Sequence, residues 1–270
     1  ASLALAAALF ISLGTGQTAA QDRPGPDVLK NLAAAKSALQ TAVDTWDAGL
    51  MAEARDRFLG CFLRDGRENP HLAYYVALAD YSLATFHLAA GSAAESDPRI
   101  AEGEAYLDKA LKARPEFPDA LALYAYLLGI EIANHPDRAM GLAMKSYQFF
   151  DQAAAADASN PRVFLLRGVY QLYVPEEFGG GPDSSLEYLD KAMALFEKES
   201  VTDPLTPSWG KDEAFTNAAL ARKRKKPTAH ITPATAPITI RARARQIPEW
   251  QTDRLNLIGH LQASPARTAQ

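Results

Sequence analysis

Apolar residues in the middle of the chain recur every three or four positions, with polar residues between them. One such stripe, within the segment 183–199, consists of Leu186, Leu189, Ala192, Met193 and Phe196. Because side chains three or four positions apart share one face of a helix, this spacing predicts amphipathic α-helices. No alternating strand pattern competes with it before residue 230, so the sequence predicts an all-α fold.

The predicted helices come in pairs, and three of the pairs begin at a proline. Pro70, Pro118 and Pro161 each open a long apolar segment, and proline suits the first helical turn because its missing N–H costs nothing there. The partner helices are expected at about 99–113, 138–155 and 183–199. A further pair and one more first helix are expected at about 27–46, 50–63 and 207–221.

A short word repeats along this region and indicates a repeat architecture. The residues Tyr-Leu-Asp-Lys-Ala at 106–110 recur at 188–192, and 149–153 keeps the same order of residue types. A small residue also follows each proline by seven positions, and these residues are Ala77, Ala125 and Gly168. Small residues at a fixed place let the second helix pack closely against the first. We therefore predict stacked antiparallel helical hairpins, an α-solenoid, over residues 21–221.

The repeated word, together with the small residue and the nearby proline, resembles the tetratricopeptide repeat (TPR). The prolines are 48 and 43 residues apart, more than the 34 residues usual for that repeat, so the resemblance is to a divergent form. Residues 160–214 look like a set of exported bacterial TPR-like proteins. They are similar, more loosely, to the T component associated with TRAP transporters, a periplasmic lipoprotein, although this sequence has no cysteine at the predicted cleavage site. The resemblance implies a solenoid that binds a partner.

The start of the chain differs from the repeats. An unbroken apolar run extends from Leu3 to Leu13 and is followed by small residues, which predicts a secretory signal peptide over 1–20 with cleavage after Ala20. The mature protein is therefore expected in the periplasm or outside the cell. No second apolar stretch approaches membrane-spanning length.

The end of the chain is basic. Residues 222–270 hold ten Lys or Arg against two acids, whereas 1–221 hold 18 bases and 30 acids. We interpret 222–270 as an irregular tail, and three hypotheses stay open for it: a disordered segment that meets anionic surfaces, a small β-hairpin, or the product of a shifted reading frame. No nucleic-acid partner is expected for an exported protein.

Three glycines, Gly179, Gly180 and Gly181, precede Pro182 and a predicted helix. Backbone N–H groups at a helix start can hold an anion, but no lysine follows at P-loop spacing and no strand precedes the glycines. We interpret them as a tight turn that uses positive φ, with an anion contact as the alternative. We expect Phe178 to pack back onto the hairpin. The helix cap is expected from Asp183, Ser184 or Ser185.

Residues that would carry chemistry are scattered. The five histidines form no pair at helical spacing, and no paired-cysteine, His-Glu-x-x-His or EF-hand pattern indicates a metal site. No Gly-x-Ser-x-Gly elbow surrounds a serine. We predict no enzymatic activity, no metal and no cofactor. The one cysteine, Cys61, lies among apolar neighbours and is expected to be a buried thiol.

Tyrosines are concentrated in the first helices, which line the inner surface of stacked hairpins. Two arginines in the same helix series are candidates to meet a carboxylate. The predicted binding residues are Tyr74, Tyr75, Tyr81, Tyr124, Tyr126, Arg162, Arg167, Tyr170, Tyr173 and Trp209. For each aromatic taken alone, burial in the core is the alternative interpretation.

The leading hypothesis is a non-catalytic periplasmic binding or scaffold protein that engages a protein, peptide or small ligand on its concave surface. The alternative is an accessory to solute transport that passes an organic acid to a membrane permease. The resemblance to the TRAP-associated component and the two arginines motivate this alternative.

Overall fold

A computed structural model describes residues 23–65 and 69–225 of the chain. The predicted signal peptide and nearly all of the predicted tail lie outside these residues. Nine α-helices and no strand occur in the described part, in the order α2 (Pro26–Thr45), α3 (Ala48–Asp65), α4 (Pro70–Ala89), α5 (Ala93–Ala113), α6 (Pro118–Asn134), α7 (Ala139–Ala156), α8 (Pro161–Tyr173), α9 (Pro182–Phe196) and α10 (Lys211–Arg224). The all-α prediction is confirmed.

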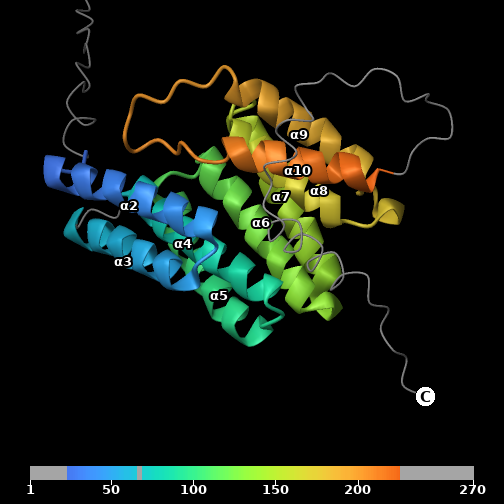
Figure 1. The fold of residues 1–270 in the computed structure, drawn as a ribbon, viewed down its shortest axis with the longest axis horizontal. Helices are drawn as coiled ribbons and strands as arrows, with labels where there is room; N and C mark the ends of the chain where they lie inside the picture. Colours follow the sequence, from blue (N-terminus) through green and yellow to red (C-terminus); the bar gives the residue numbers. More distant parts are fainter. Residues whose placement is uncertain (1–22, 66–68, 226–270) are drawn as a thin grey trace, which may run out of the picture.

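The helices pack as neighbouring hairpins. Each of α2, α4, α6 and α8 lies against the helix that follows it, and α10 packs on α9 and α8. The first helices α4, α6 and α8 also lie alongside one another, as the solenoid prediction requires (Figure 1). The stack therefore has an inner layer of first helices and an outer layer of second helices.

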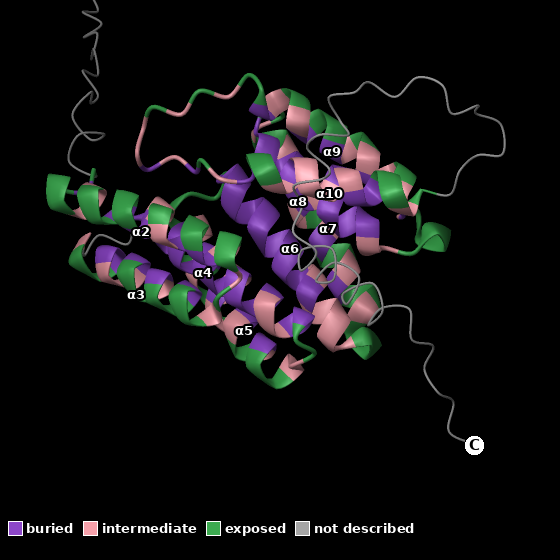
Figure 2. Ribbon diagram, in the orientation of Figure 1, coloured by how far each residue is buried: buried purple, intermediate pink, exposed green. Residues whose placement is uncertain are grey.

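The two layers differ in burial because they differ in composition. Helices α4 and α6 are apolar on nearly every face and are buried on nearly every face, whereas α5 and α7 bury only one stripe (Figure 2). A helix that is apolar all round needs neighbours on all sides. Helices α4, α6 and α8 thus form the centre of the molecule, and the second helices shield it from solvent.

Prolines start the first helices as predicted, and asparagines cap two of them. The Asn69 side chain accepts hydrogen bonds from the backbone N–H groups of His71 and Leu72, and Asn160 accepts one from Arg162. A cap of this kind satisfies N–H groups that have no partner within the helix. The largest difference from the predicted boundaries is in α5, which begins at Ala93 and carries Pro98 inside it.

The predicted small residues hold the seams between paired helices. A Cβ on Gly168 would lie 2.7 Å from Leu189 Cγ, so the two helices approach there more closely than any side chain allows. The Ser185 hydroxyl of α9 donates to the Gly168 carbonyl at 2.7 Å, and the Ser146 hydroxyl of α7 donates to the Ala125 carbonyl at 2.8 Å. The same contact at the same place in two hairpins supports a common repeat.

The segment between α9 and α10, residues 197–210, is called the connector below. It reaches back to the first hairpin, where Arg23 pairs with Asp203 at 3.1 Å and Lys36 Nζ donates to the Pro204 and Thr206 carbonyls at 3.2 and 3.0 Å. Helix α10, which follows the connector, ends three residues beyond the boundary predicted at Ala221. The connector therefore joins the two ends of the stack.

Two further expectations can be checked in the described residues. Cys61 is buried, and burial raises the pKa of its thiol, which disfavours the reactive thiolate. No helix within residues 23–65 and 69–225 is long and apolar enough to cross a bilayer.

Candidate functional site

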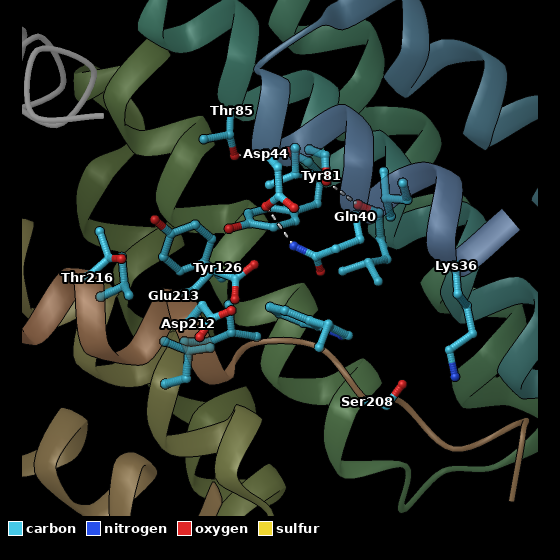
Figure 3. Close-up of a pocket in the computed structure, with 18 of the residues that line it drawn as sticks. Lys36, Gln40, Asp44, Tyr81, Thr85, Tyr126, Ser208, Asp212, Glu213 and Thr216 are labelled. Carbon is cyan, nitrogen blue, oxygen red and sulfur yellow. Dashed lines mark hydrogen bonds between the residues drawn. The ribbon is translucent and has the colours of Figure 1, made fainter. Parts of the chain in front are cut away.

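The inner faces of the first helices enclose a cavity of about 370 Å³. Helix α2 forms one side and α10 the other, while α4, α6 and α8 supply the wall between them and the connector contributes Ser208 and Trp209 (Figure 3). The stack curves far enough for its first and last helices to border the same space. The concave surface expected of a solenoid is thus a semi-enclosed cavity.

Aromatic rings form much of the wall. Tyr81 meets Tyr126 edge to face at a centroid distance of 5.5 Å, and it lies 6.5 Å from the Trp209 ring. These rings come from α4, α6 and the connector, so they join three separate parts of the chain. The aromatic residues of the lining are Trp46, Phe58, Tyr75, Tyr81, Tyr126, Tyr173 and Trp209.

Five of the predicted binding residues line this cavity: Tyr75, Tyr81, Tyr126, Tyr173 and Trp209. Tyr74, by contrast, is fully buried, and its hydroxyl accepts a hydrogen bond from Trp209 Nε1 at 2.8 Å. Tyr124 stacks on Phe149 of the outer layer, and Tyr170 packs against Phe150. Neighbouring residues of a helix point about 100° apart, so one tyrosine faces the cavity while the next faces a seam.

Several polar groups of the wall are already engaged. The hydroxyls of Ser82 and Thr85 donate to the Leu78 and Tyr81 carbonyls of their own helix. The Tyr75 hydroxyl donates to the Leu205 carbonyl of the connector at 3.2 Å. Burial raises the pKa of Tyr75, so it remains a neutral phenol.

Charge is unevenly distributed around the cavity. Asp44 comes from α2, while Asp212 and Glu213 come from α10. Figure 3 shows Asp44 facing the two α10 acids across the cavity, with Tyr81 and Tyr126 between them. Lys36 is the only base among the described lining residues, and it lies apart, beside Ser208. Burial and the charge of Arg162 lower the pKa of Lys36.

Arg162 does not reach the cavity wall. Its side chain is 3% exposed and pairs with Asp119 at 2.7 Å and with Glu199 of the connector. It also donates to the Trp209 carbonyl at 3.1 Å, while Asn160 donates to the second oxygen of Asp119 at 2.7 Å. We call these four side chains, Arg162, Asp119, Asn160 and Glu199, the Arg162 cluster. The sequence placed Arg162 on a binding surface, but the structure uses it to hold the connector.

Arg167 is also engaged elsewhere. It pairs with Asp151 of α7 at 2.7 Å, and its guanidinium lies over the Tyr188 ring at 4.9 Å. Both contacts lie toward the outer helices α7 and α9. The two arginines that motivated an organic-acid site are therefore neutralised by carboxylates away from the cavity.

The glycine segment is built as a turn. Gly179 and Gly181 have φ of 82° and 92°. The N–H groups of Gly179, Gly180 and Gly181 donate to the carbonyls of Glu176, Pro175 and Gln171, which leaves none of the three for an anion. Two expectations fail here. Phe178 is 74% exposed, and no side chain caps α9, because its N-cap residue is Gly181, which has no side chain, and Ser185 turns inward to Gly168.

Two further carboxylates, each with a buried oxygen, lie away from the cavity. Asp80 is fully buried and pairs with Arg55 of α3, yet burial raises its pKa to about 6. Burial, with the nearby charge of Glu131, raises the pKa of Glu104 to about 7, and Glu104 Oε1 has no hydrogen-bond partner among the described residues. The described residues contain no cluster of side chains suited to hold a metal ion.

Sequence reasoning missed the polar residues that α2 and α10 contribute to the cavity: Lys36, Gln40, Asp44, Asp212 and Glu213. It treated only the three central first helices as the inner surface. One signal was present in the sequence. An acid near the end of a helix opposes the helix dipole, and Asp44 occupies the last turn of α2 without a base in that turn.

Comparison with known proteins gives a likeness of fold. No family model matches the chain, and no curated protein matches it. Among solved structures, the HusA haemophore from Porphyromonas gingivalis is similar, with a TM-score of 0.60 and 22% sequence identity. The alignment covers 82% of this chain and 100% of that chain. The two chains therefore share a helical architecture over the whole of the haemophore.

Proposed function

We propose that this chain is an exported binding protein that carries a small, flat, largely apolar molecule in the cavity between α2 and α10. The observation that supports this most directly is the cavity itself. Its volume of about 370 Å³ lies in the range of small-molecule sites, and aromatic walls with a few polar groups are typical of them.

The shape of the cavity favours a small molecule over a folded partner or a peptide. In an open solenoid a peptide lies along an exposed concave face. Here α2, α10 and the connector border that face on three sides. The repeat, which we regard as a divergent TPR, would then form the wall of a ligand-binding cavity.

A carrier needs no catalytic group. No histidine or cysteine is present among the described lining residues, and the hydroxyls of Ser82 and Thr85 are committed to helix carbonyls. A nucleophile requires an adjacent base. We therefore propose binding without turnover.

The similar haemophore suggests haem as one candidate, since a haemophore is by its name a haem carrier. Protein side chains that hold haem iron are His, Cys, Met and Tyr. Among the described residues of this lining, tyrosine alone represents that group. Tyr75 is kept neutral and donates to Leu205. Our proposal therefore rests on the aromatic walls and includes no bond to iron.

The organic-acid alternative loses the observation that motivated it. Arg162 and Arg167 both pair with carboxylates outside the cavity. The remaining base, Lys36, already donates to two carbonyls of the connector. A role beside a transport system is compatible with a carrier, but an organic acid is not the ligand we propose.

Tryptophan fluorescence tests the proposal, because Trp46 and Trp209 both line the cavity. We expect saturable quenching by a flat apolar probe such as diphenylhexatriene and none by succinate. Protoporphyrin IX and haemin are titrated in parallel, and equal affinities for the two would show that iron contributes nothing to binding.

A blocked cavity provides the matched comparison. Thr216→Phe adds a ring inside the cavity, and Thr41→Phe adds the same ring to the exposed side of α2. Binding should weaken at least about tenfold in the first variant, because the ring takes the ligand's space, and stay unchanged in the second. Absence of saturable binding by every flat probe, or equal binding by both variants, would refute the proposed carrier.

A further inference from the structure

The charges that border the cavity carry information about its ligand. Three carboxylates, Asp44, Asp212 and Glu213, line it from two sides. The one lysine of the described lining has its ammonium group bonded to the Pro204 and Thr206 carbonyls and lies apart from the acids. The part of the cavity between α2 and α10 is therefore negative.

Helix stability accounts for two of these acids but not for the third. Asp212 and Glu213 lie in the first turn of α10, where the helix dipole favours negative charge. Asp44 lies in the last turn of α2, where the dipole opposes negative charge, and that turn contains no base. Its side chain accepts a hydrogen bond from Gln40 Nε2 at 2.9 Å. The position of Asp44 thus lowers the stability of its own helix.

Aromatic rings lie between the acids. Tyr81 and Tyr126 stand between Asp44 and the acids of α10 in Figure 3, and Trp209 extends the same wall. The face of an aromatic ring attracts cations, and sites for organic ammonium groups are built from such rings with nearby carboxylates. The same arrangement repels an anionic ligand, since like charges at close range in a partly enclosed site are costly.

Resting on the proposed function, we infer that the cavity binds an organic cation, an aromatic or aliphatic body that carries an ammonium or similar positive group. The body occupies the apolar wall formed by α4 and α8. The positive group lies between Asp44 and Glu213, over the Tyr81 and Tyr126 rings. Lys36 holds the connector and takes no part in binding.

Three fluorescent probes with one shared body test this inference: neutral diphenylhexatriene, its trimethylammonium derivative and its propionic acid derivative. Each is titrated against the purified chain, and energy transfer from tryptophan, compared with Trp209→Phe, locates the probe in the cavity. We expect the cation to bind about tenfold more tightly than the neutral parent and the anion about tenfold more weakly. The ratio should shrink as salt rises from about 0.02 to 0.5 M.

Matched variants assign the preference to the cavity acids. Asp44→Asn and Glu213→Gln should each lower the ratio of cation to neutral affinity about threefold. Glu187→Gln removes the same charge from an exposed position on α9 and should leave the ratio unchanged.

The outcomes separate the two proposals. Equal affinities for the three probes, or tightest binding of the anion, would overturn the inference about charge and leave the carrier proposal standing. A preference that survives both acid variants would overturn it as well. If no probe enters the cavity, both proposals fail together.

Discussion

The Arg162 cluster and the cavity are both built from first helices and the connector, yet they treat charge in opposite ways. In the cluster, Arg162 is 3% exposed, and the two oxygens of Asp119 receive bonds from Arg162 and Asn160. In the cavity, Asp44 and Asp212 are exposed and face a space of about 370 Å³. The cluster is a closed network of paired charges, whereas the acids of the cavity border a space large enough for a ligand.

This contrast separates structural from functional charge more clearly than residue type does. An arginine on a first helix and an acid on a first helix look equally promising in the sequence. A buried charge must be paired, because an unpaired one is expensive. An exposed charge beside a cavity carries no such obligation, so its position is free to serve a ligand.

The largest effect is expected from breaking the cluster. Arg162→Ala leaves Asp119 buried without its counter-charge and releases the Trp209 carbonyl, so the free energy of unfolding should fall by about 3–5 kcal/mol. Urea denaturation followed by circular dichroism measures this. Arg222→Ala is the control, because its side chain and that of its partner Asp190 are 46% and 55% exposed, and it should cost about 0.2–1 kcal/mol. Similar losses in both variants would contradict the distinction between the sites.

Trp209 belongs to both regions, so its substitution tests how they are joined. Trp209→Phe keeps a ring in the cavity wall but leaves the buried Tyr74 hydroxyl without the donor at 2.8 Å. We expect a loss of about 1–3 kcal/mol in unfolding free energy. Tyr74→Phe with Trp209→Phe should restore part of it, since no buried hydroxyl is then left unpaired. A double variant less stable than Trp209→Phe alone would refute this account.

Glu104 shows what happens to a buried carboxylate outside either region. Its folded pKa, raised to about 7 by burial and Glu131, lies above its unfolded value, so folding favours the protonated acid. The resulting penalty is absent below about pH 4.5, grows as the pH rises and levels off above about pH 7. Glu104→Gln should therefore stabilise the protein relative to wild type at pH 8 and match it near pH 4.5. Melting curves across this range check the sign, and a difference that is constant with pH would contradict it.

The smallest effect on stability is expected in the cavity. Asp44→Asn removes a charge from the last turn of α2, where the helix dipole opposes it, and should change the unfolding free energy by less than about 0.5 kcal/mol, toward greater stability. Thermal melts of the two proteins measure this difference. A loss of more than about 1 kcal/mol would place Asp44 with the structural charges and remove the contrast.

The sequence was informative about the fold because the fold is specified locally. Apolar periodicity and the prolines at positions 70, 118 and 161 define the helices, and small residues such as Gly168 mark the seams. The curvature of the stack is a different matter. It depends on the contacts of the connector with Lys36 and Tyr75, which are far apart in sequence and carry no local pattern.

The residues that line the cavity were predicted in part, because helical spacing is also a local pattern. Helical spacing identified the helices that line the cavity, and five of the predicted residues border it. It did not separate Tyr75 from Tyr74, because a small rotation of a helix decides which of two adjacent rings faces inward. Nor did it reveal that Arg162 had partners, since Asp119 and Glu199 lie 43 and 37 residues away.

The contacts between the connector and the first hairpin have a consequence for how a protein of this kind evolves. An open array of repeats gains or loses a unit at little cost, because each unit touches only its neighbours. In this molecule an inserted hairpin would pull Asp203 away from Arg23 and the Thr206 carbonyl away from Lys36. An added hairpin would therefore break these contacts, and removal of the first hairpin should loosen the last.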